Sequence, residues 1–209
     1  MEVDVPALLA AARMQDPSSD AALGKLLESY QRYLKLLARI EIGRRLQGKV
    51  DASDVVQETF LDAHRQFSHF RGEAEPQFAT WLRQILAGTL ANIVRRYLGT
   101  QARDPRLERQ LAEDLDQSTA ALGQILVDPA SSPSELAMRR EQGMIVAEAL
   151  ARLPDDYQQV LTMRHLEGLT FPEIAIRMER TVDSVEKLWI RGLTRLKREF
   201  SSQMNTSEG

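Results

Sequence analysis

Apolar residues recur at three- and four-residue steps through most of this sequence, and that spacing marks one face of an α-helix. Three stripes show the pattern: Leu23, Leu26, Leu27, Tyr30, Leu34 and Leu37; Val56, Phe60, Ala63 and Phe67; and Phe78, Trp81, Leu82, Ile85, Ile93, Val94 and Tyr97. No segment alternates apolar and polar residues as a half-buried strand does, and there is no internal repeat. We therefore expect an all-α fold, with helices over residues 21–99, the first over 21–45, burying their stripes against one another.

Turn and cap residues divide the chain into two predicted domains. Asp104-Pro105, Asp128-Pro129 and the Ser-Ser-Pro-Ser run at 131–134 bound a polar stretch that holds at most one weak helix, near 105–123. We predict an N-terminal extension over 1–20, a first small helical domain over 21–100 and a linker over 101–134. A second small helical domain over 135–203, beginning at a Ser134 cap, and a disordered tail over 204–209 complete the prediction.

The second domain contains a predicted helix-turn-helix in a four-helix, winged-helix-like arrangement. Gly168 suits the end of one helix, and Thr170-Phe171-Pro172-Glu173 forms a capping box that starts a short one. Thr181 then caps a longer basic helix to about Phe200. The second helix of such a motif enters the DNA major groove. From periodicity alone, DNA reading and a merely solvated basic face remain equal alternatives.

Charge is segregated along the chain, although the net charge of −3 argues against nucleic-acid binding by the chain as a whole. Residues 51–62 carry four acids and no base, whereas residues 81–103 carry four arginines and no acid. Residues 180–200 carry six bases against three acids. Such segregation implies more than one kind of partner surface.

Several function classes are excluded by what the sequence lacks. It has no cysteine, which rules out disulfides and thiolate zinc sites and fits a cytoplasmic protein. It has no apolar run of the roughly 18–20 residues that span a bilayer, and its acidic start lacks a signal peptide's basic flank. Phosphate-binding glycine loops and H-E-x-x-H motifs are also missing. We therefore expect no catalytic residues, cofactor, metal, small-molecule substrate or membrane insertion.

Two segments resemble conserved regions of the sigma-70 family of RNA polymerase sigma factors. DASDVVQETFLDAHRQFSHFRGEAEPQFATWLRQILAGTLANIVRRY, residues 51–97, resembles the second conserved region, and LPDDYQQVLTMRHLEGLTFPEIAIRMERTVDSVEKLWIRGLTRLKREF, residues 153–200, resembles the fourth. Two regions joined by a short linker resemble the extracytoplasmic-function (ECF) group. The resemblance implies a factor that binds core RNA polymerase, directs promoter-specific initiation at minus-ten and minus-thirty-five elements, and has no catalysis of its own.

The same resemblance implies three sets of site residues. Asp51, Asp54, Gln57 and Glu58 would face the polymerase clamp, although Asp51 also suits a helix cap. At the minus-ten element, Phe70, Arg71 and the loop to about Gln77 would capture an unstacked base, and Arg83, Asn92, Arg95 and Arg96 would lie near the strand. At the minus-thirty-five element, the DNA-facing set is Arg180, Thr181, Ser184, Glu186, Lys187, Ile190 and Arg191. Trp81 is expected in the core rather than as a stacking platform.

Some residues depart from the family's usual pattern, and two other functions remain alternatives. Glu186, Ile190 and Gly88 differ from what many relatives carry, which leaves the promoter sequence open. Leu188, expected on the exposed face, and Ile190 suit an interface with a possible anti-sigma factor. One alternative is a helix-turn-helix regulator that acts without being a polymerase subunit. The other is a helical adaptor with no DNA role, against which the basic segments argue.

Overall fold

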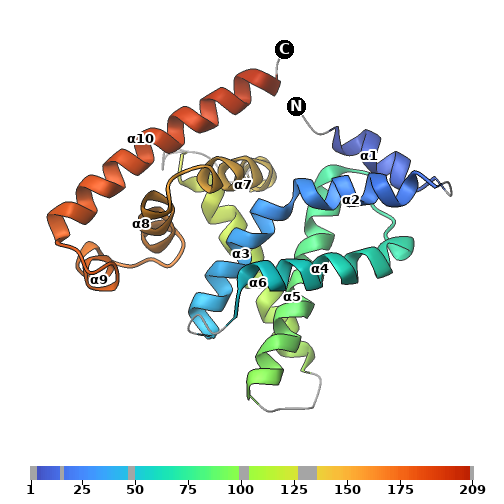
Figure 1. The fold of residues 1–209 in the computed structure, drawn as a ribbon, viewed down its shortest axis with the longest axis horizontal. Helices are drawn as coiled ribbons and strands as arrows, with labels where there is room; N and C mark the ends of the chain where they lie inside the picture. The colour runs from blue at the N-terminus through green and yellow to red at the C-terminus, as the bar shows by residue number, and fades with distance from the viewer. Residues whose placement is uncertain (1–3, 15–16, 47–49, 99–103, 127–135, 208–209) are drawn as a thin grey trace. The chain divides into compact units, whose positions relative to one another are not determined.

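The computed structural model describes residues 4–14, 17–46, 50–98, 104–126 and 136–207 (Figure 1). Every regular element in these ranges is a helix, which confirms the expected all-α class. In chain order the helices are α1 (Val5–Ala12), α2 (Ser19–Ser29), α3 (Gln31–Arg45), α4 (Ala52–Gln66), the short 3₁₀ helix η1 (Phe67–His69), α5 (Glu75–Leu98), α6 (Pro105–Gln124), α7 (Leu136–Ala151), α8 (Asp155–His165), α9 (Phe171–Arg177) and α10 (Val182–Ser207). The chain divides into two compact units, Met1–Asp116 and Gln117–Gly209, and α6 begins in the first and ends in the second.

The first unit is built around the three predicted apolar stripes. α3 and α4, α4 and α5, and α3 and α5 pack against one another, and α1 packs on α2. Its fully buried side chains include Leu26, Leu34, Leu37, Phe78 and Leu82. Tyr97, at the end of the third stripe, is 52% exposed and does not belong to this core.

The segment expected as one helix over residues 21–45 forms two helices that meet at Tyr30. The Ser29 hydroxyl donates to the Leu26 carbonyl at 2.7 Å, and the Tyr30 amide donates to the Leu27 carbonyl at 3.0 Å. The Tyr30 backbone bond spans three residues rather than four, as in a 3₁₀ turn, so the α-helical ladder is interrupted at this point. The Tyr30 ring is buried and meets Phe78 edge-on, with 5.4 Å between ring centroids.

The N-terminal extension, for which the sequence suggested no structure, contains α1. The Asp4 carboxylate accepts the Ala7 amide at 2.9 Å, and proline stands in the first turn where it costs no hydrogen bond. Val5 and Leu9 are buried on the side that packs against α2. The family resemblance did not extend to this helix, which begins well before residue 20.

The predicted linker contains a long helix. The weak helix expected near 105–123 is present as α6, and in the first unit its Asp114 pairs with Arg45 of α3. Asp116, also on α6, pairs with Arg83 of α5 at 2.6 Å. The predicted turn at 131–134, including the Ser134 cap, lies outside the described residues.

In the second unit α10 packs against α7, α8 and α9. The predicted capping box is present at the start of α9: the Glu173 carboxylate accepts both the Thr170 amide and the Thr170 hydroxyl at 2.7 Å. Gly168 has a φ of +72°, the left-handed conformation expected after a helix end. α10 continues to Ser207, beyond its expected end and into the segment predicted as a disordered tail. The rest of that tail lies outside the described residues.

Candidate nucleic-acid and partner interfaces

The acidic face of α4 begins at its cap. Asp51 caps the helix and accepts the Ser53 amide at 2.5 Å, a hydrogen bond that lowers the pKa of the Asp51 carboxyl. Asp54 and Gln57 are exposed on the following turns, and Glu58 is half-buried. The face therefore presents carboxylates and an amide on a rigid helix, and capping by Asp51 is compatible with a role for it at an interface.

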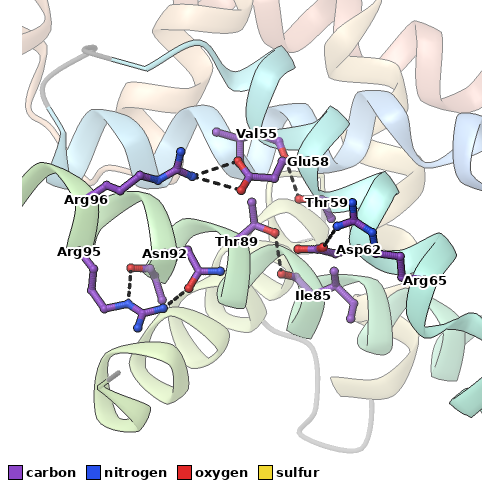
Figure 2. Close-up of polar contacts among 11 residues, drawn as sticks. Val55, Glu58, Thr59, Asp62, Arg65, Ile85, Thr89, Asn92, Arg95 and Arg96 are labelled. Atoms are coloured by element: carbon purple, nitrogen blue, oxygen red, sulfur yellow. Dashed lines mark hydrogen bonds and ion pairs between the residues drawn. The ribbon is translucent and has the colours of Figure 1, made fainter. Parts of the chain in front are cut away.

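A shallow cavity of about 470 Å³ lies where α4 meets the end of α5. Asp54 and Glu58 line one side of it, and Arg96 and Tyr97 line the other. Figure 2 shows the Arg96 guanidinium bridging both carboxylate oxygens of Glu58, at 3.1 and 3.3 Å. The structure thus joins a residue predicted to face polymerase with one predicted to face DNA. The Arg96 side chain is 67% exposed and that of Glu58 is 41% exposed, so water screens this ion pair and it contributes little stability.

Asn92 and Arg95 form a second polar group on α5. The Arg95 guanidinium donates to the Asn92 side-chain oxygen and to the Ala91 carbonyl (Figure 2). Asn92 and Arg96 are exposed, and Arg95 is half-buried. Three of the side chains predicted near the minus-ten strand therefore share the accessible end of this helix.

The loop before α5 and the first residues of that helix, together residues 70–77, are tightly folded. The Gln77 side-chain oxygen accepts the amides of Glu73 at 2.7 Å and Ala74 at 3.1 Å. Arg71 is exposed and donates to the Ser68 carbonyl at 3.1 Å. We call residues 70–77 the reading loop below.

Phe70 was expected to receive an unstacked base, but its ring is 8% exposed. It lies 4.9 Å from the Trp81 ring and 5.5 Å from the Phe78 ring, measured between centroids. A face already covered by aromatic neighbours is not available for stacking, so Phe70 packs into an aromatic cluster instead. Trp81, expected in the core, packs in this cluster but is half-buried.

Arg83 was also expected near DNA, and the structure contradicts that expectation. Its side chain is 4% exposed, and its guanidinium donates to Asp116 at 2.6 Å and to the Tyr33 hydroxyl and Thr80 hydroxyl at 3.0 Å each. A guanidinium held inside by three partners does not reach a DNA strand. Arg83 therefore belongs to the interior of the first unit.

The predicted DNA-facing residues of the second unit lie at and after the start of α10. All are exposed except Ser184, which is half-buried: Arg180, Thr181, Glu186, Lys187, Ile190 and Arg191. The Thr181 hydroxyl accepts the Ser184 amide at 3.2 Å, the expected cap. Leu188, expected to be exposed, is half-buried.

Two cations of this face pair with acids of the same unit. Arg180 donates to Asp156 at 2.6 Å, and Lys187 donates to Asp183 at 2.8 Å. Since these four side chains are substantially exposed, each pair is weak. Phosphate oxygens are therefore able to compete for both cations.

Aromatic contacts that the sequence analysis did not foresee hold α10 in place. The Trp189 ring N–H donates to His165 Nε2 at 3.0 Å, and the Trp189 ring meets Phe171 edge-on at 5.5 Å. Arg164 lies 4.8 Å from the centre of the Phe171 ring. Burial, assisted by the Arg164 charge, lowers the pKa of His165 and so favours the neutral imidazole that accepts this hydrogen bond.

Within the described ranges, no helix is both long and apolar enough to cross a membrane. In those same ranges, no three histidine, aspartate or glutamate side chains gather closely enough to hold a metal ion.

Comparison with known proteins identifies two family regions in this chain. The family model described as Sigma-70 region 2 matches residues 29–98, and the model described as Sigma-70, region 4 matches residues 143–196. Between them they cover the end of α2 through α5 and most of α7 through α10.

Named relatives agree with these matches. The "ECF RNA polymerase sigma-E factor" of Haemophilus influenzae is 36% identical over 141 residues, which is 68% of this chain and 70% of the relative. Proteins of the same name from Salmonella typhimurium and Escherichia coli are each 36% identical over 137 residues, 65% of this chain and 66% of the relative. The chain belongs to the sigma-70 family of RNA polymerase sigma factors, in its extracytoplasmic-function group.

Proposed function

We propose that this sigma factor docks on core RNA polymerase through the acidic face of α4 and reads promoter DNA with two separate surfaces. The observation that carries the proposal is the exposed carboxylate and amide group of Asp51, Asp54 and Gln57 on one rigid helix. A face of this kind complements a basic partner, and such complementarity sets register and association rate more than raw affinity. Glu58 lies at the edge of this acidic face, and we expect its carboxylate to contact polymerase as well once the two proteins bind.

The proposed minus-ten surface is smaller than the sequence analysis expected. It consists of Arg71 in the reading loop and of Asn92, Arg95 and Arg96 at the end of α5. Exposed cations beside an amide suit the backbone and base edges of a melted strand, where unstacking a base costs a few kcal/mol that contacts must offset. Phe70 is left out of this surface because its ring is buried.

The proposed minus-thirty-five surface is the exposed start of α10 with the residues just before it. Lys187 and Arg191 suit phosphate or guanine, Glu186 suits the amine of cytosine, and Ile190, which is 56% exposed, suits a thymine methyl group. Ile190 is also where we would expect a possible anti-sigma factor to make apolar contact. Arg180, Thr181 and Ser184 complete the surface at the helix start.

The remaining parts of the proposal concern organisation and chemistry. We assign polymerase binding and minus-ten reading to residues 21–100, minus-thirty-five reading to residues 135–203 and a connecting role to residues 101–134. Sigma factors are not enzymes, and we expect the polymerase to supply all catalysis. We also expect the protein to act in the cytoplasm, where its partners are.

Run-off transcription with bacterial core polymerase over a library of promoter fragments tests the proposal. We expect discrete start sites that depend on this protein, and we expect Asp54→Ala to reduce both polymerase affinity and transcription by about tenfold, within the range for a charge at an interface. Asp62→Ala is the matched control: it removes one carboxylate from the same helix, but that carboxylate pairs with Arg65 at 3.0 Å.

The outcomes separate the alternatives. If Asp54→Ala initiates as strongly and binds polymerase as tightly as the wild type, the polymerase interface does not lie on the acidic face of α4. Promoter binding by the chain alone, with no start sites and no polymerase binding, would support the helix-turn-helix regulator instead. An adaptor would add no salt-sensitive promoter binding to core polymerase, whereas the proposed factor should add it.

A further inference from the structure

The first helix of the chain reaches the proposed reading loop although it lies outside both matched family regions. α1 begins at the Asp4 cap and buries Val5, Leu9 and Ala12 against α2. Leu9 is 2% exposed, so α1 contributes a fully packed side chain to the core of the first unit. Arg13 follows directly at its C-terminal cap position.

Arg13 makes two contacts with the reading loop across 59 residues of sequence. Its guanidinium carbon lies 5.6 Å from the centre of the Phe70 ring, a cation–π distance, and its Nη2 donates to the Gly72 carbonyl. The side chain is nevertheless exposed, so it lies at the surface beside the loop. The residue at the end of α1 thus contacts the Phe70 ring, and Trp81 lies against the same ring.

The loop has little freedom to adopt another path while these contacts hold. A Cβ on Gly72 would lie 2.5 Å from the Phe70 ring and 2.8 Å from Cβ of Gln77, so the backbone passes as close to both as it can. Gln77 fixes the next two amides from the α5 side. Arg13 fixes the Gly72 carbonyl from the α1 side.

We propose that Arg13 is a positioning residue for promoter reading, because it holds the reading loop in the shape that receives the melted strand. This inference rests on the proposed function and extends it to a part of the chain that neither family region includes. Arg13 acts through Phe70 and Gly72 rather than by contacting DNA. A loop that is already ordered loses less conformational entropy when the strand binds, so more of the free energy of its contacts remains to distinguish one base from another. Discrimination between bases therefore depends on the Arg13 contact.

The test compares Arg13→Ala and Arg13→Lys with a charge-matched control in the full chain. Lys25→Ala is that control, because it removes one exposed cation from the neighbouring α2. Each protein is assembled with core polymerase, and initiation is measured on promoters that carry all four bases at every minus-ten position. We expect Arg13→Ala to lower base discrimination about fivefold at one position, a size typical of losing a cation–π contact and a hydrogen bond at the surface.

Two further readouts separate positioning from a general loss of structure. Hydrogen exchange of the Glu73 and Ala74 amides should accelerate in Arg13→Ala, while polymerase affinity stays at the wild-type value and the unfolding midpoint falls by no more than about 4 °C. Arg13→Lys should recover part of the discrimination, since an ammonium keeps the cation–π contact but not the planar donor of the guanidinium.

Three results would overturn the inference. In the first, Arg13→Ala shows wild-type discrimination and wild-type amide exchange. In the second, Arg13→Ala loses activity equally at all positions together with polymerase affinity, as a misfolded unit would. In the third, Lys25→Ala reproduces the effect, which would reduce it to net charge. Absence of start sites with the wild-type chain would overturn the proposed function itself, whereas the exchange measurement reports on the Arg13 contact independently.

Discussion

Replacing Arg83 with alanine should destabilise the first unit rather than remove a DNA contact. The guanidinium is buried and donates to Asp116, Tyr33 and Thr80, so it ties α5 to α6 and α3 within that unit. Two of these bonds reach residues 33 and 50 positions away in the sequence. The variant therefore loses tertiary contacts that no local helix signal replaces.

The expected size follows from the burial of each partner. Removing one member of a buried, hydrogen-bonded ion pair costs about 3–5 kcal/mol. The Asp116 side chain is 38% exposed and regains water when it loses Arg83, so we expect about 2.5 kcal/mol. An unfolding entropy of about 2.1 cal/mol/K per residue over a unit ending at Asp116 gives roughly 0.24 kcal/mol/K. The unfolding midpoint should therefore fall by about 10 °C.

Tryptophan fluorescence during thermal unfolding measures this change in the relevant unit. The chain has two tryptophans, and Trp189→Phe leaves Trp81 as the reporter of the first unit. Arg96→Ala in the same background is the matched control, since Arg96 also lies on α5 but has a 67% exposed side chain in a surface pair. We expect that control to move the midpoint by less than about 4 °C, because exposed pairs contribute about 0–1 kcal/mol.

One combination of results would contradict a purely structural role for Arg83. If Arg83→Ala unfolds within about 2 °C of the parent while promoter melting by the holoenzyme is lost, the side chain acts on DNA. Its buried position would then not represent the polymerase-bound state. Arg83→Met, which keeps the aliphatic stem, should recover part of the stability if packing as well as charge is involved.

Four further substitutions should alter stability or its pH dependence in directions set by local geometry. Gly143→Ala should destabilise the protein by about 1–3 kcal/mol, because the added Cβ would lie 2.3 Å from the Thr119 carbonyl oxygen. Gly24→Ala should stabilise it by about 0.5–1 kcal/mol, because a Cβ there meets nothing within 4 Å and alanine is the better helix former. Urea titration measures both changes. Glu173→Ala should lower the melting temperature at pH 7, because hydrogen bonds from Thr170 lower the pKa of this carboxyl. The difference from the wild type should shrink as the pH falls below the ordinary value of 4.5 and through the lowered pKa, because protonation removes this contribution. Burial lowers the pKa of His165 from 6.5, so stability should fall as the pH drops below about 6.5, where the unfolded chain gains a proton that the folded chain resists. His165→Gln should remove that part of the pH dependence in melts followed across this range.

Local signals made the fold class and the helix-turn-helix predictable. The spacing of apolar residues is a property of each helix by itself, and the Thr170 to Glu173 box and Gly168 act within a few residues of their own positions. These features can be recognised in the sequence without knowing which helices pack against one another. The break at Tyr30 was missed because the apolar stripe continues on both sides of it, so the period alone gives no sign of a change in direction.

The two corrections to the site have a tertiary origin. Arginine side chains on helices are mostly exposed, so the sequence predicts that Arg83 faces solvent. Its ion-pair partner Asp116 lies on α6, which was predicted only as a weak helix within a linker. One sequence pattern did indicate burial: Ala79, Arg83, Leu86 and Leu90 follow helical steps, and all four are at most 4% exposed. The burial of Phe70 depends on Trp81 and on Arg13 of α1, a helix for which the sequence suggested no structure.

Ion pairs within the chain give a physical reason to expect weak DNA binding by the free protein. Three cations of the proposed DNA surfaces, Arg96, Arg180 and Lys187, each pair with an acid of the same unit. DNA phosphates displace an exposed partner at little cost, but the displaced carboxylate stays nearby and repels them. The free chain should therefore release few counterions and show a shallow salt dependence when titrated with promoter fragments. Since Glu58 lies on the face proposed for polymerase, binding of that partner would withdraw the acid that Arg96 now holds. The salt dependence of promoter binding by the holoenzyme should consequently be steeper than the sum of the salt dependences of the free factor and of core polymerase. A holoenzyme salt dependence equal to that sum would exclude this coupling.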